Sequence, residues 1–574
     1  GWIKQANEPI WTPTQRGVQQ PGVSIFSAFN HTQYWPSVNF TDYKSALLGR
    51  HARVVVVSAF DRNVVRGFRL TAFSAIPEQG VMVCLEETNQ PTKYFLANNY
   101  QPTQTLDRGI FYAALLDYLN RWDSYYSPKL YLPGQEGKRL VDSAKSTMTV
   151  AMTVYTNVTT PNYGVGLDYW SNTTARGGSL PLTTLDINNA LLGFQQVDAA
   201  ANLVGYYFDT YVTDSGVIEM TGWKTECPFP DSIADYGRML HLFVEVARAT
   251  MAAKQPNWVQ EHWPRGKALI QYTLNLQATA ANNTSSPSYA KGLLKGPPEH
   301  DTCQDEDYYF SISAWTWRGL VTASRWLEES GLDDELGAAC KAGAADLRAA
   351  LDNAIAIAKV DSKPYTFYPP IAGPNQTQFY TMTESVLASY SNFRYFPETL
   401  MASAFNESVE TAILEFRRHT SGFVSGMARW SDHVDQMPQF GTIWSTLLWQ
   451  DEDVDRSANL LIGHAANYLS RGVFGGTEQL GFRGLGQYRA YLAPPAERDI
   501  DVIGPTGALL AMQLRWSLLF VPYDEDLIHI CRGCLRRWYS STGLETIPQP
   551  PTNTPSIVLD GSTRYGNVSF SITP

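Results

Sequence analysis

The feature of the sequence that most constrains the fold is a long series of amphipathic segments that begins near residue 136. Apolar residues recur at i, i+3 and i+7, as in Leu240, Phe243 and Ala247, and this spacing places them on one face of a helix. Such a face is stable only when it is buried against other helices. The segments therefore predict one large helical domain, with helices at residues 138–156, 184–192, 197–213, 231–253, 263–279, 307–330, 333–358, 382–391, 397–418, 438–449, 452–470 and 502–520.

The connections between these segments alternate in length, and the alternation predicts how the helices are arranged. The long connections are 161–181, 215–230, 280–305, 425–438 and 472–505. About twelve helices with every second connection long predict an (α/α)6 toroid, in which six inner helices line a funnel and the long loops build one face. A helical solenoid is the alternative, but the chain shows no fixed repeat of about 34–47 residues.

The two ends of the chain differ from this helical region. Residues 1–22 contain three prolines and little periodicity, and they predict an extended arm. Residues 23–135 hold short β-branched runs and predict an irregular, partly β region with one helix near 111–121. Residues 136–520 form the predicted toroid, and residues 521–574 predict a linker followed by a small β appendage. The expected fold class is mainly α, with these two additions.

Asparagine sequons indicate the compartment. Nine Asn-X-Ser/Thr sequons are present, whereas about three or four would be expected by chance from average composition. The excess predicts a secreted glycoprotein, extracellular or at the cell surface, with several unused sites as the alternative. The predicted glycosylation sites are Asn30, Asn39, Asn157, Asn172, Asn282, Asn283, Asn375, Asn406 and Asn567.

The six cysteines suit an oxidising compartment. Cys531 and Cys534 form a CxxC motif without a second CxxC or a histidine pair, which favours a short-loop disulfide over a zinc site. Cys227 and Cys303 lie in long loops and are predicted to form a disulfide across the mouth of the fold. The two others are expected to be free buried thiols: Cys84 and Cys340.

Charge and hydropathy exclude several classes of function. A formal net charge of -11 argues against binding to nucleic acid and against an electrostatic membrane anchor. The longest apolar segment, 506–521, is interrupted by Gln513 and Arg515, so a core helix is predicted rather than a membrane span. No metal or cofactor is predicted. The acidic residues at 305–307 and 451–453 leave calcium as a weak alternative, because they lack the EF-hand spacing.

The helical region resembles the six-hairpin glycosidases, the superfamily that includes glucoamylases. The segments that carry the resemblance are Pro-Asn-Tyr-Gly-Val-Gly-Leu-Asp-Tyr-Trp at 161–170, Gly-Leu-Leu-Lys-Gly-Pro-Pro-Glu-His-Asp at 292–301 and Gly-Gly-Thr-Glu-Gln-Leu-Gly at 475–481, followed by Arg-Asp at 498–499. In glucoamylases the loop that corresponds to 292–301 carries the general acid, and a Ser-Glu-Gln segment carries the catalytic base. In this chain, Pro-Glu-His-Asp stands where glucoamylases have a Trp-Glu-Glu-type sequence.

The resemblance implies hydrolysis of glycosidic bonds by two carboxyl groups, one protonated and one that activates water. Glu299 and Asp301 are the candidates for the acid, and Glu478 is the candidate for the base. An inverting enzyme would hold the two groups about 6.5–9.5 Å apart. The structural alternatives are salt bridges from the first loop to Arg318 or Lys295, and a Glu478 carboxylate bonded to backbone amides in a tight turn.

Substrate binding is expected to use aromatic and polar side chains near the long loops, because the C–H faces of sugar rings pack on aromatic rings. Trp315 and Trp317 have helix core as an equal alternative, and Asp186 is interpreted as an N-cap or first-turn acid. The predicted substrate-binding residues are Tyr169, Trp170, Trp223, Asp235, Trp315, Trp317, Arg318 and Trp430.

Three functions fit these patterns. The first is an inverting glycoside hydrolase that acts on a poly- or oligosaccharide. The second is a non-catalytic secreted glycoprotein with a structural, assembly or sugar-binding role, which would use the 1–22 arm for self-assembly. The third is a polysaccharide lyase, for which Arg429 and His433 would suit an acidic sugar.

Overall fold

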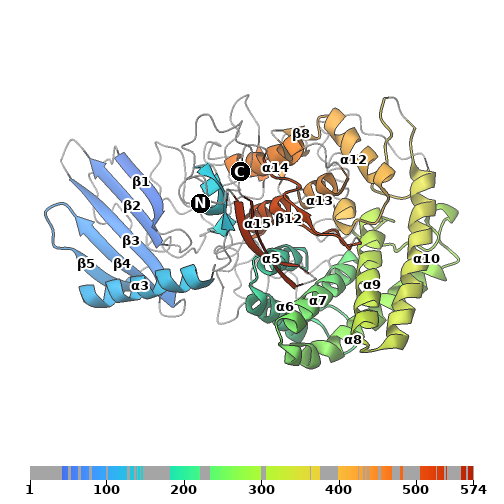
Figure 1. Cartoon of the computed structure of the whole chain (residues 1–574), viewed down its shortest axis with the longest axis horizontal. Helices are drawn as coiled ribbons and strands as arrows, with labels where there is room; N and C mark the ends of the chain where they lie inside the picture. The colour runs from blue at the N-terminus through green and yellow to red at the C-terminus, as the bar shows by residue number, and fades with distance from the viewer. Residues whose placement is uncertain are drawn as a thin grey trace.

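The computed structural model shows a helical body with a β-sheet region and a short β tail (Figure 1). The structure describes residues 42–48, 54–61, 66–76, 80–98, 101–125, 130–134, 137–138, 140–142, 144–145, 181–219, 233–298, 306–361, 364–374, 398–424, 426–430, 433–435, 439–449, 454–467, 479–481, 504–524, 526–535, 538, 557–563 and 566–572.

The helical body is an (α/α)6 toroid built from an inner ring and an outer ring. The inner helices are α5 (Pro181–Gly193), α7 (Ala234–Ala252), α9 (Phe310–Ser330), a short helical turn at 398–402, α13 (Gln439–Trp449) and α15 (Gly504–Leu518). The outer helices are α6 (Val197–Tyr211), α8 (Pro256–Ala281), α10 (Asp334–Ala358), α12 (Glu407–His419) and α14 (Val454–Asn467). Helix α5 packs against both α7 and α15, α7 packs against α9, and α15 packs against α13. Helix α9 reaches the 398–402 turn through the hydrogen bond from Arg318 Nε to the Ala402 carbonyl oxygen.

The lengths of the connections follow the predicted alternation. Every step from an inner helix to the next outer helix is short, as at 194–196, 253–255 and 331–333. Every step from an outer helix to the next inner helix is long, as between Tyr211 of α6 and Ala234 of α7. The long connections therefore all lead to the N-terminal ends of the inner helices.

Two predicted helices differ most from the structure. Residues 397–418 do not form one helix, because Ser403 adopts a left-handed backbone conformation (φ 51°) and ends the helical turn. Helix α12 then restarts behind Asn406, whose side chain accepts a hydrogen bond from the Val409 amide at 3.2 Å. Helix α8 begins at Pro256 rather than near 263, since proline is well suited to the first turn of a helix.

Helices α7 and α9 approach each other closely at two glycines. A Cβ on Gly237 would lie 2.1 Å from the Trp315 carbonyl oxygen, and a Cβ on Gly319 would lie 2.7 Å from the Gly237 carbonyl oxygen. Only glycine permits this contact. It sets the distance between two inner helices whose first turns carry buried polar side chains.

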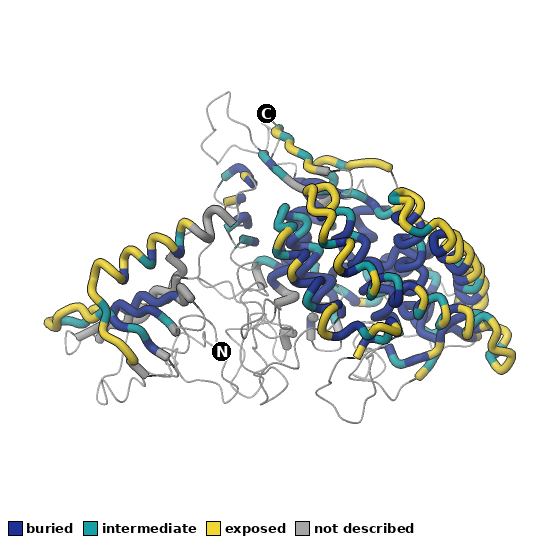
Figure 2. Tube along the Cα trace, turned by 90° about the horizontal axis from the view of Figure 1, so that it is seen from below, coloured by how far each residue is buried: buried dark blue, intermediate teal, exposed yellow. Residues whose placement is uncertain are grey.

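The interior of the toroid is continuous and mainly apolar, as the dark blue segments of the helical body show (Figure 2). Its largest fully buried side chains include Trp315, Trp326 and Trp538. Helix α15, which contains the longest apolar segment, is part of this core. No described helix is both long enough and apolar enough to cross a membrane.

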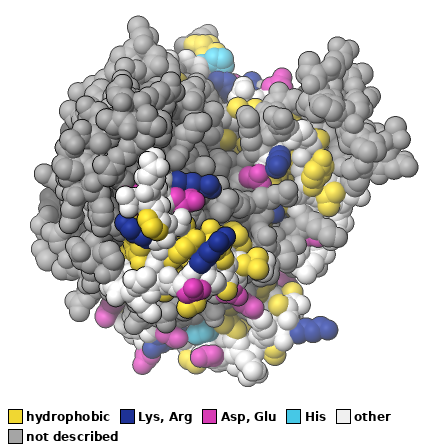
Figure 3. Space-filling view, turned by 90° about the vertical axis from the view of Figure 1, so that its left-hand side faces the viewer, with side chains coloured by type: hydrophobic (Ala, Val, Ile, Leu, Met, Phe, Trp, Pro, Cys, Tyr) yellow, Lys and Arg dark blue, Asp and Glu magenta, His cyan; other side chains and the backbone are white. Residues whose placement is uncertain are grey.

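The N-terminal region is a six-stranded antiparallel meander, which is more regular than predicted. Its strands are β1 (Asp42–Leu48), β2 (Val54–Asp61), β3 (Arg66–Ile76), β4 (Gly80–Glu87), β5 (Lys93–Asn98) and β6 (Gln101–Thr105), and they pair in chain order. Helix α3 (Arg108–Tyr125) packs on one face, where its Phe111 and Leu115 meet Phe73 of the sheet. On its outer side Ile110 and Leu116 are exposed, and hydrophobic side chains are visible on this face of the molecule (Figure 3).

Three small sheets complete the fold. Strands β14 (Ile557–Thr563) and β15 (Gly566–Ile572) form a hairpin where a small β appendage was predicted, and β14 also pairs with β7 (Leu130–Tyr131), which precedes the toroid. A four-stranded sheet joins β8 (Phe423–Val424), β9 (Met427–Trp430), β10 (His433–Asp435) and β11 (Gln479–Gly481). Strands β12 (Leu519–Phe520) and β13 (His529–Ile530) form a short ladder after α15.

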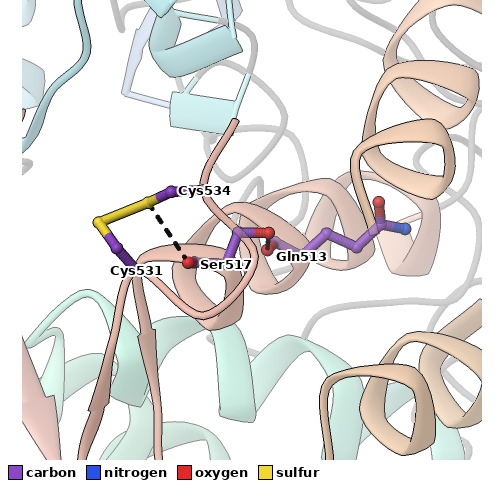
Figure 4. Close-up of a disulfide and its surroundings, with 4 residues drawn as sticks. All are labelled: Gln513, Ser517, Cys531 and Cys534. Carbon is purple, nitrogen blue, oxygen red and sulfur yellow. Dashed lines mark hydrogen bonds between the residues drawn. A yellow bond between two sulfur atoms is a disulfide. The ribbon is translucent and has the colours of Figure 1, made fainter. Parts of the chain in front are cut away.

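A disulfide joins Cys531 to Cys534 beside the C-terminal end of α15 (Figure 4). Between the two cysteines, the Arg532 guanidinium donates a hydrogen bond to the Leu448 carbonyl oxygen near the end of α13. The Cys534 sulfur lies 3.6 Å from the Ser517 carbonyl oxygen. The disulfide loop therefore covers the ends of two inner helices, away from the long connections. The other two described cysteines are free and buried, as predicted: Cys84 and Cys340.

Candidate functional site at the loop-bearing end of the inner ring

Most of the predicted site residues lie outside the described residues. This group contains both acid candidates, the base candidate, three aromatic residues and one predicted disulfide: Glu299, Asp301, Glu478, Tyr169, Trp170, Trp223, Cys227 and Cys303. Strand β11 begins one residue after Glu478, and its Gln479 pairs with Asp435 of β10. Trp430 belongs to β9, but its place in the strand does not define a sugar-binding role.

A charged network crosses the inner ring and centres on Arg238 of α7. Its Nη1 donates to Asp235 Oδ1 at 2.6 Å, and its Nη2 donates to Glu398 Oε2 at 2.7 Å. The same Glu398 oxygen accepts a hydrogen bond from Trp315 Nε1 at 3.1 Å. The guanidinium carbon of Arg238 also lies 5.6 Å from the centre of the Trp315 ring. Three inner elements are thereby joined by charge-assisted hydrogen bonds.

The network lies at the end of the ring to which the long connections lead. Asp235 and Arg238 lie near the start of α7, and Trp315 occupies the second turn of α9. Glu398 is the first described residue of the short inner helical turn. The Asp235 prediction thus falls within this network, where a short ion pair with Arg238 holds its carboxylate.

Asp186 of α5 belongs to the same polar cluster, and its predicted role as an N-cap or first-turn acid is wrong. Helix α5 begins at Pro181, so Asp186 lies in the second turn, with only 1% of its surface exposed. Burial raises the pKa of this carboxyl well above its usual value, and the Glu398 carboxylate raises it further, while Arg238 opposes the shift. The uncharged form of Asp186 is therefore favoured beside Glu398.

Two polar atoms in this cluster are buried without a hydrogen-bond partner in the described part of the chain: Asp186 Oδ2 and Arg238 Nε. Unsatisfied buried polar atoms are uncommon in native proteins, and each requires an explanation. Their presence beside an ion pair shows that the cluster has hydrogen-bonding capacity that its own side chains do not use.

Arg318 and Trp317 do not have the substrate-binding positions that the sequence predicted. The Arg318 guanidinium is 1% exposed, donates to both Asp524 carboxylate oxygens at 2.9 and 2.7 Å, and is therefore held in the core. It also lies over the Tyr523 and Trp317 rings, 4.7 Å from each centre. Trp317 carries Arg348 of α10 on its ring as well, so it faces the outer helix rather than the funnel. Both residues were misassigned because their proximity in sequence to a long loop does not define the direction of their side chains on α9.

Trp315 is a core residue of its helix, which is the alternative that the sequence left open. It is fully buried in the helix core, so a sugar ring has no open face on which to pack. Its contribution to the cluster is the indole N–H that holds Glu398.

Arg238 and Glu398 were not among the site residues predicted from the sequence, although the sequence around Arg238 indicated a buried ion pair. It precedes the segment Met239–Val244, which is apolar except for His241, and a cation buried there requires carboxylate partners. Glu398 follows Pro397 at a helix start, a position at which acids are ordinary, so the sequence does not distinguish it from a surface residue. No group of three or more potential metal ligands occurs within the described ranges.

Comparisons with known proteins bear on the fold. No protein-family model matches the chain, and no curated protein sequence matches it. The solved structure of a bacterial glucoamylase complexed with acarbose is similar, with a TM-score of 0.50 and 10% identity over 83% of this chain and 85% of that chain. A wild-type glycosidase has a TM-score of 0.44 with 11% identity over 68% of this chain and 100% of that chain. A family 76 glycoside hydrolase from a bovine Bacteroides thetaiotaomicron strain has a TM-score of 0.37 with 11% identity over 83% and 99%.

The glucoamylase similarity, together with the alternating helices, defines the class. The chain has an (α/α)6 toroid fold similar to that of the bacterial glucoamylase. At 10% identity this similarity concerns the fold alone, and the chemistry depends on the residues of this chain.

Proposed function

We propose that the protein is a secreted glycoside hydrolase that acts on a poly- or oligosaccharide with inversion of the anomeric carbon. The observation that carries the proposal is the position of the Arg238–Glu398 network, at the end of the inner ring to which every long connection leads. In this proposal Glu299 or Asp301 is the general acid, and Glu478 is the base. The glucoamylase-like fold supports the reaction class.

The exposure of the described sequons supports the secreted part of the proposal. Asn282, Asn283, Asn406 and Asn567 are all exposed. The Oδ1 atom of Asn406 caps α12, which leaves its Nδ2 available for a glycan. We expect protein from a eukaryotic secretory host to lose mass on enzymatic removal of N-glycans, and an unchanged mass would contradict this part.

The test of the reaction is turnover on a panel of neutral and acidic glycans, with the variants Glu299→Gln, Asp301→Asn and Glu478→Gln. Removal of an essential acid or base should lower kcat by a factor of about 10²–10⁴. Glu306→Gln is the matched control, because Glu306 lies near the same loop and is exposed. If Glu299→Gln and Glu478→Gln both keep full turnover, the site assignment is wrong.

The panel also separates the other two functions. A lyase would release a product with a new carbon–carbon double bond from a uronate, whereas a hydrolase adds water and creates no such bond. Binding of a glycan without any turnover would favour a non-catalytic glycoprotein with a sugar-binding or structural role. Its self-assembly would then be tested by comparing the oligomeric size of the protein with and without residues 1–22.

A further inference from the structure

The charges of the Arg238 network do not balance. Arg238 is a single cation that donates to two carboxylates, Asp235 and Glu398. Burial raises the pKa of the neighbouring Asp186 carboxyl well above its usual value, which favours its uncharged form. Arg238, Asp235 and Glu398, counted by themselves, carry one surplus negative charge in a largely desolvated environment, where charges act more strongly than in water.

Glu398 is the member of the network that is best placed to meet a ligand. Its side chain is 11% exposed, whereas those of Asp235 and Arg238 are 4% and 6% exposed. Its Oε2 is held by Arg238 and by the Trp315 indole, which fixes the orientation of the carboxylate. Within the described part of the chain, no donor contacts Oε1. This oxygen is thus a pre-oriented hydrogen-bond acceptor.

Two unpaired polar atoms of the same cluster are a second observation that points to a ligand. Asp186 Oδ2 and Arg238 Nε are buried and without partners among the described residues. A neutral carboxyl can donate as well as accept a hydrogen bond. Glu398 Oε1 can accept a hydrogen bond, and the unpaired atoms of Asp186 and Arg238 can form further ones. This combination suits the hydroxyl groups of an uncharged pyranose, because each hydroxyl both donates and accepts.

We propose that Glu398 is a specificity-determining residue whose Oε1 accepts hydrogen bonds from the hydroxyls of an uncharged sugar residue and excludes sugars that carry a carboxylate. The proposal rests on the glycoside-hydrolase function above and narrows its substrate class. A uronate carboxylate at this position would meet the Glu398 carboxylate, and Arg238 already donates to two acceptors. Uncharged sugars avoid this repulsion.

The test compares sugars that differ only in the charge at C6. Matched oligosaccharide pairs (gluco and glucurono, galacto and galacturono, manno and mannurono) are titrated calorimetrically against the full-length protein. We expect the wild type to bind the neutral member of a pair at least about tenfold more tightly. Glu398→Gln should lower this neutral-to-uronate ratio by about tenfold, because the repulsive charge is removed.

The ratio separates specificity from a general structural effect. A variant that only loosens the fold would weaken both members of a pair and leave the ratio unchanged. Glu245→Gln is the matched control, because it removes a charge from α7 at an ion pair with Arg248, far from Glu398 in sequence, and should keep the ratio of the wild type. Circular dichroism and a melting curve confirm that both variants are folded.

Two results would overturn the inference. One is tighter binding of a uronate than of its neutral partner by the wild type, which would leave the hydrolase proposal standing if that uronate is also hydrolysed. The other is an unchanged ratio in Glu398→Gln. If no member of any pair binds or is cleaved, the proposed function itself fails, and the inference fails with it.

Discussion

Glu410 of α12 is a buried carboxyl that should make the stability of this protein depend on pH. It has no exposed surface, and it accepts hydrogen bonds from Trp449 Nε1 at 2.7 Å, Ser445 Oγ at 3.0 Å and the Phe405 amide at 3.3 Å. Burial raises its pKa from 4.5 to about 7, although these three donors oppose the shift. The folded protein therefore retains a proton at pH values where the unfolded chain has released it.

The sign and size of the effect follow from this difference in pKa. Below pH 4.5 both states are protonated and the group has no effect. Between pH 4.5 and 7 the unfolded state alone ionises, so the free energy of unfolding decreases as pH rises. Because each unit of pKa difference between the folded and unfolded states corresponds to about 1.4 kcal/mol, the total loss of stability should be about 3 kcal/mol by pH 7 and above.

His241 of α7 acts in the opposite direction and would hide this effect in the wild type. It is 1% exposed, and burial lowers its pKa from 6.5 to about 4. Its neutral form is bonded through Nδ1 to Thr322 Oγ1 at 3.0 Å. Since the unfolded state alone takes up a proton between pH 6.5 and 4, the free energy of unfolding decreases as pH falls through that range. The contributions of His241 and Glu410 nearly cancel between pH 4.5 and 6.5.

The assay is therefore a difference measurement. Urea unfolding of the wild type and of Glu410→Gln is followed by tryptophan fluorescence from about pH 4 to about pH 8. Relative to the wild type, the variant should gain about 3 kcal/mol between pH 4.5 and 7, because the glutamine does not titrate. A difference curve that is flat to within about 0.5 kcal/mol, the margin within which independent effects add, would refute the reasoning.

Other parts of the fold yield three further predictions. His241→Gln should remove the opposite slope, so that the variant gains stability over the wild type as pH falls from 6.5 to 4, measured by the same unfolding curves. Gly237→Ala should destabilise the protein by about 3 kcal/mol because its Cβ would collide with the Trp315 carbonyl, whereas Gly343→Ala, which meets side-chain atoms at 3.1 Å and beyond, should cost little in a thermal melt. Cys531→Ser should lower the free energy of unfolding by about 2 kcal/mol under oxidising conditions and by nothing in reductant.

The sequence predicted the toroid because its periodic signal is redundant. In α9 and α10 the apolar positions repeat over many turns, and the structure buries the corresponding side chains, such as Leu320 and Leu347. The break at 403–406 could not be predicted, because the apolar residues Ala402, Ala404 and Phe405 continue the pattern across it. The left-handed backbone of Ser403 depends on tertiary contacts, including the Arg318 hydrogen bond to its carbonyl oxygen.

The site was harder to predict because it depends on which helices become neighbours. Asp235 was identified from its position at the start of a helix. Its partner Arg238 could not be identified as a site residue, because its second partner, Glu398, lies 160 residues later in the sequence. Trp317 and Arg318 carried the residue types of a sugar site and proved to be core residues. Residue type alone therefore identified candidates for the sugar-binding site, whereas the direction of each side chain in the fold shows which of them lie in the core.

Two buried arginines in the inner ring, Arg318 and Arg238, show how hydrogen bonding distinguishes a core residue from a candidate site residue. Arg318 uses all three guanidinium nitrogens, because Nε donates to the Ala402 carbonyl oxygen and the two Nη atoms reach Asp524. A fully satisfied network of this kind ties the elements together and leaves nothing for a ligand. Arg238 leaves Nε without a partner among the described residues and sits beside a carboxyl oxygen that also lacks one. A half-satisfied buried network costs stability without increasing rigidity, and the sugar hydroxyls proposed above would supply the partners that Arg238 and Asp186 lack.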